Sequence, residues 1–280
     1  MKVLDTVTAM QAFRGEFSGG SLGLVPTMGA LHAGHLSLVD AATRECGFVV
    51  VTIFVNPAQF GPNEDFTRYP RTLEADLAAL AGHGVDLVFA PTTESMYRPG
   101  HATYVEMLGP ALPLEGAFRP GHFRGVATIV LKLFNLVQPD RAYFGRKDYQ
   151  QALLVRRMVD DLNLPLHVEV CPIAREPDGL AMSSRNVYLS AAERQDALAI
   201  PRALQAVRAA FAAGERHSES LLRRGRDTAG AQVQLEYLEL VDAESLQPVD
   251  VIAAPAVCAI AAQSGATRLI DNVLLEGDLA

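Results

Sequence analysis

The sequence predicts an α/β fold in which a doubly wound parallel sheet is followed by a smaller α+β domain. In the first part of the chain, apolar strand-like runs alternate with helix-periodic segments, and repeated βα units of this kind form parallel sheets. Residues 48–55 (FVVVTIFV) form a continuous β-branched and aromatic run, typical of a strand covered on both faces. After about residue 172 the pattern changes to a helix followed by short strands.

The expected elements of the first domain follow one another regularly. Strands are expected at 22–26, 48–55, 86–90, 142–144 and 166–171, and helices at 31–46, 72–83, 123–137 and 148–162. Gly84 is a stop signal for the second of these helices.

The second part is expected to open with a long helix. Ser190 and Glu193 have capping-box spacing, and the helix runs to about residue 213 across Pro201. Strands are expected at 234–241, 257–261 and 267–275. We place the junction near residues 172–175, which gives domains of 1–173 and 174–280.

Composition and charge exclude several classes of protein. The 280 residues are 49% apolar and 20% charged, an ordinary globular balance. No stretch approaches the roughly 18 uncharged apolar residues of a membrane helix, and the N-terminus lacks the apolar core of a signal peptide. We therefore expect a cytoplasmic protein with no membrane partner. The net charge of −8 argues against nucleic acid, and the basic patch at 221–226 (LLRRGR) is interpreted as a solvated turn.

The three cysteines are far apart and lie in apolar contexts. Cys46, Cys171 and Cys258 show no CxxC spacing, so we expect small core residues, with neither a disulfide framework nor a zinc site. A nucleophilic role for one of them is the alternative.

The most specific segment is residues 23–36 (GLVPTMGALHAGHL), which is typical of a strand, a sharp turn and a helix start. A helix N-terminus at the carboxyl edge of a parallel sheet offers N–H groups and partial positive charge to an anion. His32 and His35 share one face of the opening turn, and Gly34 removes a Cβ between them. This favours a nucleotide triphosphate over two merely polar histidines. A metal site lacks a supporting carboxylate or third ligand.

Three further polar segments also follow expected strands. Residues 143–151 (YFGRKDYQQ) offer Lys147 to phosphate oxygens, with Gln151 four residues on along the same helical face. Residues 178–186 (DGLAMSSRN) form a plausible phosphate clamp, and residues 56–61 (NPAQFG) offer Gln59 to substrate hydroxyls. Each alone also fits a structural role, such as a surface ion pair of Lys147. Together they predict one crevice at the carboxyl edge of the sheet. Neither GxGxxG nor GxxxxGK[ST] occurs, so the nucleotide is bound differently from dehydrogenases and P-loop enzymes.

These motifs resemble those of the pantoate–β-alanine ligase family. PTMGALHAGH is similar to its nucleotide-binding HxGH motif, and NPAQFGPNEDFTRYPRT, EGAFRPGHFRGVATIVLKLFN, FGRKDYQQ and DGLAMSSRN resemble further family signatures in the family's order. The match spans about residues 23–188, whereas HxGH alone reaches only the nucleotidyltransferase superfamily. The resemblance implies a Rossmann-like sheet of the HxGH nucleotidyltransferase type, and it implies a homodimer.

The resemblance also implies roles for individual residues. His35, His32, Lys147 and Arg185 would be catalytic, and Gln59, Gln151 and Asn56 would bind substrate. The implied ATP contacts are Pro26, Thr27, Met28, Gly29, Ala30, Leu31, His32, Ala33, Gly34, His35, Gly145, Arg146, Lys147, Asp148, Ala174, Met182, Ser183, Ser184 and Arg185. Two positions depart from the family pattern: Arg146 stands where Glu is usual, and Ala174 where Val is frequent.

The implied reaction joins pantoate to β-alanine at the expense of ATP. Pantoate's carboxylate would attack the α-phosphorus, with Mg²⁺ on the outer phosphates, and the amine of β-alanine would then attack the acyl-adenylate. The loop at 62–72 and the second domain are candidate lids over this water-sensitive intermediate. The alternatives are another HxGH nucleotidyltransferase that keeps the nucleotide in its product, a non-catalytic nucleotide sensor, and an NAD-dependent oxidoreductase, which the missing glycine fingerprint disfavours.

Overall fold

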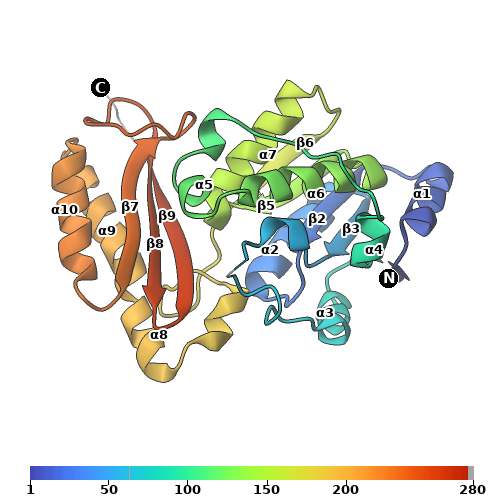
Figure 1. Ribbon diagram of the computed structural model, residues 1–280, viewed down its shortest axis with the longest axis horizontal. Helices are drawn as coiled ribbons and strands as arrows, with labels where there is room; N and C mark the ends of the chain where they lie inside the picture. The colour runs from blue at the N-terminus through green and yellow to red at the C-terminus, as the bar shows by residue number, and fades with distance from the viewer. Residues whose placement is uncertain (63, 277–280) are drawn as a thin grey trace. The chain divides into compact units, whose positions relative to one another are not determined.

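The computed structural model describes residues 1–62 and 64–276 (Figure 1). The chain divides into two compact units. The first comprises residues 1–111, 115–146 and 150–172, and the second comprises residues 112–114, 147–149 and those from 173 onward. Residue 63, in the loop expected as a lid, and residues 277–280 of the expected second domain lie outside the described residues.

The first unit is built on a six-stranded sheet in which all neighbouring strands are parallel. The strands are β1 (Lys2–Leu4), β2 (Leu22–Thr27), β3 (Phe48–Ile53), β4 (Leu87–Phe89), β5 (Arg141–Gly145) and β6 (His167–Cys171). Their order is β1-β4-β3-β2-β5-β6. The predicted parallel α/β fold is therefore confirmed. The edge strand β1 was not predicted, because three residues are too short to show a period.

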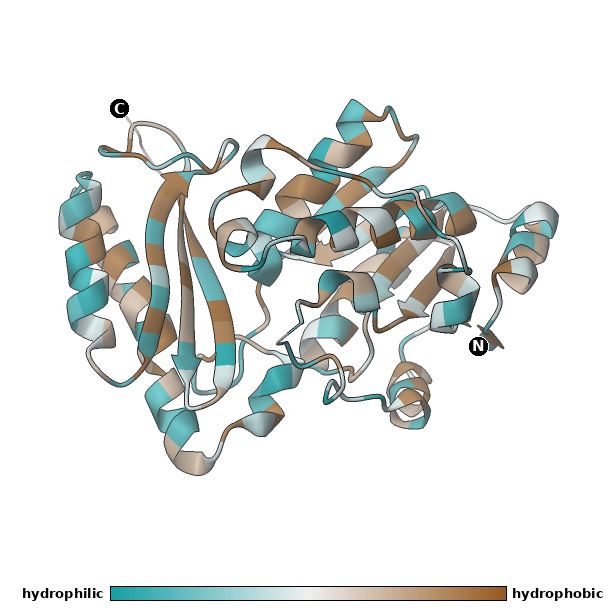
Figure 2. Cartoon of the chain, in the orientation of Figure 1, coloured by the Kyte–Doolittle hydropathy of each residue, from teal (hydrophilic) through white to brown (hydrophobic). Residues whose placement is uncertain are grey.

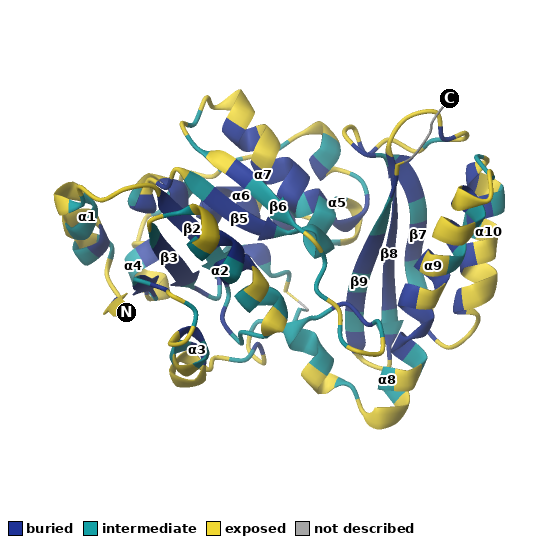
Figure 3. Ribbon diagram, turned by 180° about the vertical axis from the view of Figure 1, so that it is seen from behind, coloured by how far each residue is buried: buried dark blue, intermediate teal, exposed yellow. Residues whose placement is uncertain are grey.

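Helices cover both faces of this sheet. They are α1 (Val7–Glu16), α2 (Ala33–Glu45), α3 (Leu73–Leu80), α4 (Thr93–Met96), α5 (Glu115–Phe118), α6 (His122–Val137) and α7 (Tyr149–Asp161), with 3-10 turns η1 (Pro57–Gln59), η2 (Gly109–Ala111) and η3 (Arg146–Asp148). Side chains of α1, α6 and α7 form one core with the sheet, and those of α2 and α3 form the other. The inner strands β2, β3, β4 and β5 are accordingly mostly apolar and buried (Figures 2 and 3).

The second unit contains a three-stranded antiparallel sheet with helices. Its strands are β7 (Gln234–Asp242), β8 (Ala256–Ser264) and β9 (Thr267–Leu275), and its helical elements are η4 (Ser184–Tyr188), α8 (Ala191–Ala197), α9 (Ala199–Ala212) and α10 (Ser218–Ala229). Helices α9 and α10 lie side by side against the sheet (Figure 1). The predicted α+β pattern is confirmed.

Two predictions for this unit were wrong. The expected single helix from residue 190 to 213 is two helices, α8 and α9, and Pro201 is the third residue of α9, where a missing N–H breaks no intrahelical bond. The capping box that opens α8 is present, since the Glu193 N–H donates to Ser190 Oγ at 3.3 Å. The basic patch at 221–226 lies inside α10 and is not a turn. Its glycine, Gly225, marks close packing instead of a turn, because a Cβ there would meet Leu238 Cδ2 at 2.7 Å.

The cysteines differ in their surroundings. Cys258 is buried in β8, and burial raises the pKa of its thiol to about 12. Cys46 and Cys171 are partly buried and pack against a core of the first unit, so the prediction of core residues holds in full for Cys258 and in part for the other two. Burial also raises the pKa of the Cys171 thiol. Because the thiolate is the nucleophile, these shifts disfavour a nucleophilic role for Cys171 or Cys258. Within residues 1–62 and 64–276, no helix is long and apolar enough to cross a membrane.

Candidate active site

Each of the four polar segments follows the carboxyl end of a sheet strand. Strands β3, β2, β5 and β6 are neighbours in that order and end at Ile53, Thr27, Gly145 and Cys171. Because they are parallel, these ends lie at one edge of the sheet. The chain runs from β2 to β3 and β4 on one side and returns as β5 on the other side of β2. This reversal makes the β2–β5 boundary the switch point at which ligands bind in open α/β sheets.

The β2–α2 turn is held by a buried carboxylate that the sequence did not reveal. Gly29 and Ala30 have φ values of +81° and +49°. Asp76, only 2% exposed at the start of α3, accepts hydrogen bonds from the N–H groups of Ala30 at 3.0 Å and Leu31 at 2.7 Å. The N–H groups of Ala30 and Leu31 are therefore occupied within the protein, and the predicted anion contact concerns the helix start that follows them. A backbone donor in a sharp turn needs a partner, and Asp76 supplies it.

The two histidines cap helix α2. His32 is the N-cap residue, and its Nδ1 accepts from the Gly34 N–H at 3.1 Å, while its own N–H donates to His35 Nδ1 at 3.4 Å. The ring centroids are 4.1 Å apart, so both rings lie on one face of the opening turn, as their spacing predicts. Because both Nδ1 atoms accept, each neutral ring carries its proton on Nε2. The pair therefore carries two Nε2–H donors, a suitable set for phosphate oxygens.

Met28, Asn56 and Gln59 lie together beside this turn. Gln59 is 9% exposed; its Oε1 accepts from Asn56 Nδ2 at 3.0 Å, and its Nε2 donates to Met28 Sδ at 3.1 Å. A thioether is a weak acceptor, so a substrate hydroxyl can replace it at little cost.

Asn56, predicted as a substrate contact, is fully engaged within the protein. Besides Gln59, its Nδ2 donates to Gly125 O at 3.2 Å, and its Oδ1 accepts from Tyr97 Oη at 2.8 Å and from the Ala58 N–H at 3.3 Å. These four bonds use both hydrogens and both lone pairs of the amide. Asn56 therefore orients Gln59, and a substrate contact would have to displace one of these bonds.

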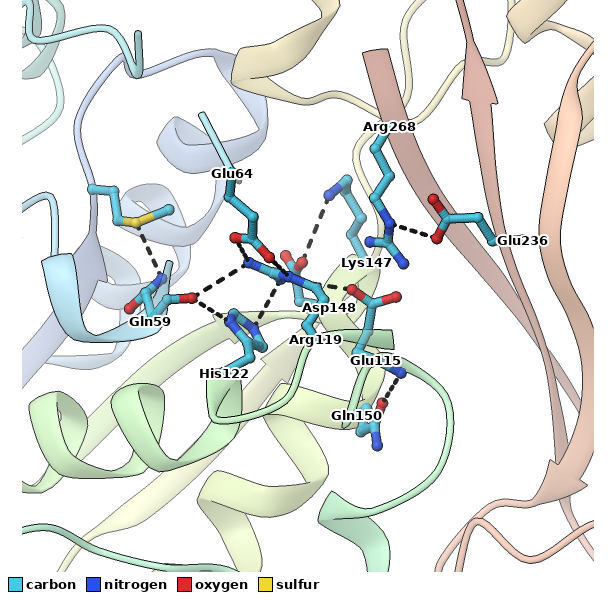
Figure 4. A network of polar contacts seen from close by, with 11 residues as sticks. Gln59, Glu64, Glu115, Arg119, His122, Lys147, Asp148, Gln150, Glu236 and Arg268 are labelled. Atoms are coloured by element: carbon cyan, nitrogen blue, oxygen red, sulfur yellow. Dashed lines mark hydrogen bonds and ion pairs between the residues drawn. The ribbon is translucent and has the colours of Figure 1, made fainter. Parts of the chain in front are cut away.

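A network of Glu64, Arg119 and His122 contacts the backbone of Gln59 (Figure 4). It was not predicted as part of the site. Arg119 makes a bidentate pair with Glu64, at 2.7 and 2.6 Å, and its Nη1 lies 3.1 Å from His122 Nε2. His122 Nδ1 lies 2.8 Å from the Gln59 carbonyl oxygen. Since a carbonyl only accepts, Nδ1 carries the proton and Nε2 accepts from the guanidinium. Burial raises the pKa of Glu64, but the hydrogen bond and charge of Arg119 outweigh burial and hold it below its ordinary value.

The signal that could have found this network lies in the EGAFRPGHFRG segment, which carries Glu115, Arg119 and His122. Glu115 Oε2 lies 3.6 Å from Arg119 Nη1, and the backbone N–H of Glu115 donates to Gln150 Oε1 at 3.1 Å. The segment resembles a family signature, but no expected strand end precedes these residues. No local pattern therefore places them beside Gln59.

His122 should make stability depend on pH. Burial, reinforced by the charge of Arg119, lowers its pKa from the ordinary value of 6.5 to about 4. The folded protein therefore binds this proton less tightly than the unfolded chain does. The unfolding free energy that depends on neutral His122 is fully present above pH 6.5, declines as the pH falls towards 4 and is lost below pH 4. The full effect is about 3 kcal/mol of unfolding free energy.

The measurement is urea unfolding at pH 7 and pH 4 for the wild type and His122→Asn, whose amide can still donate to the Gln59 carbonyl but does not titrate. The wild type should lose about 3 kcal/mol more than the variant across this range. Equal losses in the two proteins would contradict a buried, neutral His122.

Lys147 belongs to the second unit, in turn η3. Its Nζ lies 3.7 Å from Asp148 Oδ1, and its carbonyl oxygen accepts from Asn272 Nδ2 at 2.9 Å. Gln151 does not share a regular helical face with Lys147 as predicted, because the 3-10 turn gives way to α7 only at Tyr149. The two residues also belong to different units.

The loop that carries Arg185 is also part of the second unit. The Met182 N–H donates to Ala174 O at 3.0 Å, so the backbone carbonyl of Ala174, an implied ATP contact, closes this loop. Ser183 caps η4, its Oγ accepting from the Arg185 N–H at 3.3 Å. The approach of Lys147 and Arg185 to the histidines of the first unit stays a prediction.

The fold and the paired-histidine helix cap at the switch point define a nucleotide-binding α/β enzyme of the HxGH type. A family model described as pantoate-beta-alanine ligase matches residues 2–274. The chain belongs to this family, and the predicted enzyme class, a ligase that forms pantothenate, is confirmed.

Known relatives are similar over nearly their whole length. A pantothenate synthetase from Acidobacterium capsulatum is 58% identical over 257 residues, covering 91% of this chain and 86% of that protein. One from Roseiflexus castenholzii is 53% identical over 278 residues, covering 99% and 100%. The crystal structure of the Thermus thermophilus enzyme has a TM-score of 0.93 at 50% identity, covering 98% and 99%. That of the Francisella tularensis enzyme, complexed with β,γ-ATP and β-alanine, has a TM-score of 0.80 at 35% identity, covering 100% of each chain.

Proposed function

We propose that this ligase works in two steps, forming a pantoyl adenylate from pantoate and ATP and then transferring the pantoyl group to β-alanine, with release of pyrophosphate and AMP. The observation that carries the proposal is the helix cap of His32 and His35, which supplies two Nε2–H donors at the switch point of a parallel sheet. The β,γ-ATP and β-alanine with which the Francisella tularensis enzyme is complexed support the choice of substrates.

In the first step, a carboxylate oxygen of pantoate attacks the α-phosphorus, and the bond to the bridging oxygen of pyrophosphate breaks. Negative charge grows on the phosphoryl oxygens and the leaving group. His35 and His32 would donate hydrogen bonds to these oxygens, and Lys147 and Arg185 would neutralise their charge. Gln59 and Gln151 would hold the pantoate hydroxyls, with Asn56 fixing the amide of Gln59.

In the second step, the amine of β-alanine attacks the acyl carbon, and AMP leaves with the electrons of the C–O bond. No enzyme nucleophile is needed, so catalysis rests on positioning and charge neutralisation. Water would destroy the mixed anhydride. The loop at 62–72 and the second domain are the proposed lids.

Mg²⁺ is the proposed partner of the outer phosphates. This ion prefers oxygen ligands and is commonly held by phosphates together with one or two carboxylates. Asp148, a partly exposed carboxylate beside Lys147, is an oxygen donor of the right chemistry in the Lys147 segment. Bound there, the ion would supply charge neutralisation to the leaving pyrophosphate.

The proposal predicts a defined order of product release. With ATP, Mg²⁺ and pantoate alone, the wild type should release pyrophosphate to about one equivalent per site, and AMP should accumulate only when β-alanine is added. Lys147→Ala should slow pyrophosphate release by about 100-fold, because a point charge at the phosphates is lost. Pyrophosphate and AMP are measured by coupled assays in single-turnover and steady-state form.

The same assay separates the alternatives. A nucleotidyltransferase would leave the nucleotide in its product and give no free AMP with β-alanine. A nucleotide sensor would bind ATP and release no pyrophosphate. Either result would reject the two-step proposal, and a normal rate in Lys147→Ala would refute the role assigned to Lys147. A homodimer and a cytoplasmic location complete the proposal, and sedimentation of the purified protein tests the first of these.

A further inference from the structure

Two adjacent buried side chains of β9 reach segments that the proposed function assigns to ATP. Asp271 and Asn272 are each 3% exposed and lie in the middle of the strand. Consecutive strand side chains point to opposite faces, so the pair can reach two different parts of the second unit. Neither residue belongs to a motif recognised in the sequence.

Asp271 binds Arg175, at the start of the loop of residues 175–181 that leads to Arg185. Its Oδ2 accepts from Arg175 Nη1 at 2.7 Å and its Oδ1 from Arg175 Nη2 at 3.0 Å, a bidentate pair. Arg175 Nη1 also donates to the Gly179 carbonyl at 3.1 Å, and Arg175 pairs with Ala181 in an antiparallel bridge. These contacts fix the backbone of residues 175–181, which leads directly into residues 183–185.

On its outer side the same loop is held by α8. Arg194 Nη2 donates to Glu176 Oε2 and Asp178 Oδ2, both at 2.7 Å, and Asn186 Nδ2 donates to Glu176 Oε1 at 2.8 Å. These groups are partly exposed and screened by solvent, so each of these pairs contributes little.

Asn272 holds the backbone of the second cationic segment. Its Nδ2 donates to the Lys147 carbonyl at 2.9 Å, and its N–H donates to Asp271 Oδ1 at 2.8 Å. The hydrogen bond to Asp271 ties the two contacts to each other. A short stretch of β9 thus fixes the Lys147 backbone and the base of the Arg185 loop relative to one another.

We infer that Asp271 and Asn272 are positioning residues, which hold Lys147 and the loop bearing Arg185 in the register needed to grip the triphosphate of ATP. The inference rests on the proposed function of Lys147 and Arg185. It assigns the C-terminal sheet a part in ATP recognition beyond that of a lid. Misplacement of a charge by about 1 Å can cost on the order of 100-fold in rate, so loss of either contact should be measurable.

The test compares Asp271→Asn and Asn272→Leu with the wild type. Asp271→Asn breaks the bidentate charge pair and should raise the KM for ATP about tenfold. Asn272→Leu removes the donor to the Lys147 carbonyl and should lower kcat for pyrophosphate release about tenfold. In both variants the KM for pantoate should stay within about twofold of the wild type, a split that general destabilisation would not produce.

A matched control is Glu215→Gln, another carboxylate-to-amide change in the second unit. Glu215 accepts from the N–H groups of Arg216 and His217, both at 2.9 Å, in the turn between α9 and α10. It should leave both kinetic constants unchanged. If Asp271→Asn fails to fold, Arg175→Lys decides the question, because this change keeps the positive charge and loses the bidentate geometry. A several-fold rise in the KM for ATP is expected there.

Calorimetric titration with a non-hydrolysable ATP analogue separates this inference from the proposed function. If the wild type binds the analogue and releases no pyrophosphate with pantoate, the two-step function fails, and the Kd values of the variants still decide the role of β9. Wild-type values of both the Kd and the KM for ATP in folded Asp271→Asn or Arg175→Lys would overturn the inference.

Discussion

Replacing His35 by alanine is expected to slow pyrophosphate release with pantoate by about 100- to 1,000-fold, because one preorganised donor to the developing charge is lost. In the folded protein His35 Nδ1 accepts from the His32 N–H, so the ring proton lies on Nε2, the atom proposed to donate to phosphate. The rate is measured in a single turnover with saturating ATP and pantoate. A wild-type rate in this variant would exclude His35 from the reaction.

The same substitution removes part of a helix cap, and this effect has to be separated from chemistry. Loss of the capping contact should cost about 0.5–1 kcal/mol of unfolding free energy, too little to unfold a domain. His35→Gln offers an amide at the position where capping boxes commonly use Gln. It should restore stability while the rate stays at least about tenfold below the wild type.

His167→Ala serves as the matched histidine control. His167 begins β6, at the amino end of a strand, and pairs with Glu169 at 3.3 Å. It therefore lies at the opposite edge of the sheet from the segments that follow the strands. Neither the rate nor the KM for ATP should change in this variant.

Combining His35→Ala with Lys147→Ala tests whether the two residues act on one transition state. Groups that act as a unit lose far less in the double variant than the product of the single losses. A loss equal to that product would indicate independent roles. The comparison therefore addresses the predicted convergence of the two cationic segments with the histidines, on which the proposed first step depends.

The sequence predicted the parts of the fold that depend on local patterns. Apolar runs such as residues 48–55 marked buried strands, and polar segments marked the strand ends where ligands bind. The capping box at Ser190 was found because both partners lie within one turn. Strand order has no local signature, yet parallel pairing alone was enough to place at one edge the four strand ends that the polar segments follow.

What the sequence did not reveal depends on contacts between distant residues. Asp76 lies 45 residues from the N–H group of Leu31, and His122 lies 63 residues from the Gln59 carbonyl. A carboxylate in an ordinary helix and a histidine after a glycine carry no local sign of such partners. The assignment of Lys147 to the second unit was missed for the same reason, because its contact with Asn272 spans 125 residues.

The close approach of α6 to η1 provides a prediction that links stability to the substrate site. A Cβ at Gly125 would lie 2.1 Å from the Ala58 carbonyl oxygen and 2.6 Å from the Gln59 nitrogen, both backbone atoms that cannot rotate away. Gly125→Ala should therefore lower the unfolding free energy by about 2–4 kcal/mol, as overpacking forces the helix and the turn apart. Because Gln59 moves with the turn, the KM for pantoate should rise more than the KM for ATP.

Gly15→Ala is the control for this substitution, since Gly15 lies in helix α1 and a Cβ added there would meet no atom within 4 Å. Alanine there should raise the unfolding free energy by about 0.5–1 kcal/mol through its better helix propensity. Opposite signs for the two Gly→Ala variants, measured by urea unfolding, would separate steric contact from backbone entropy. If Gly125→Ala were as stable as the wild type, the close contact that positions Gln59 would be refuted, and its effect on pantoate binding with it.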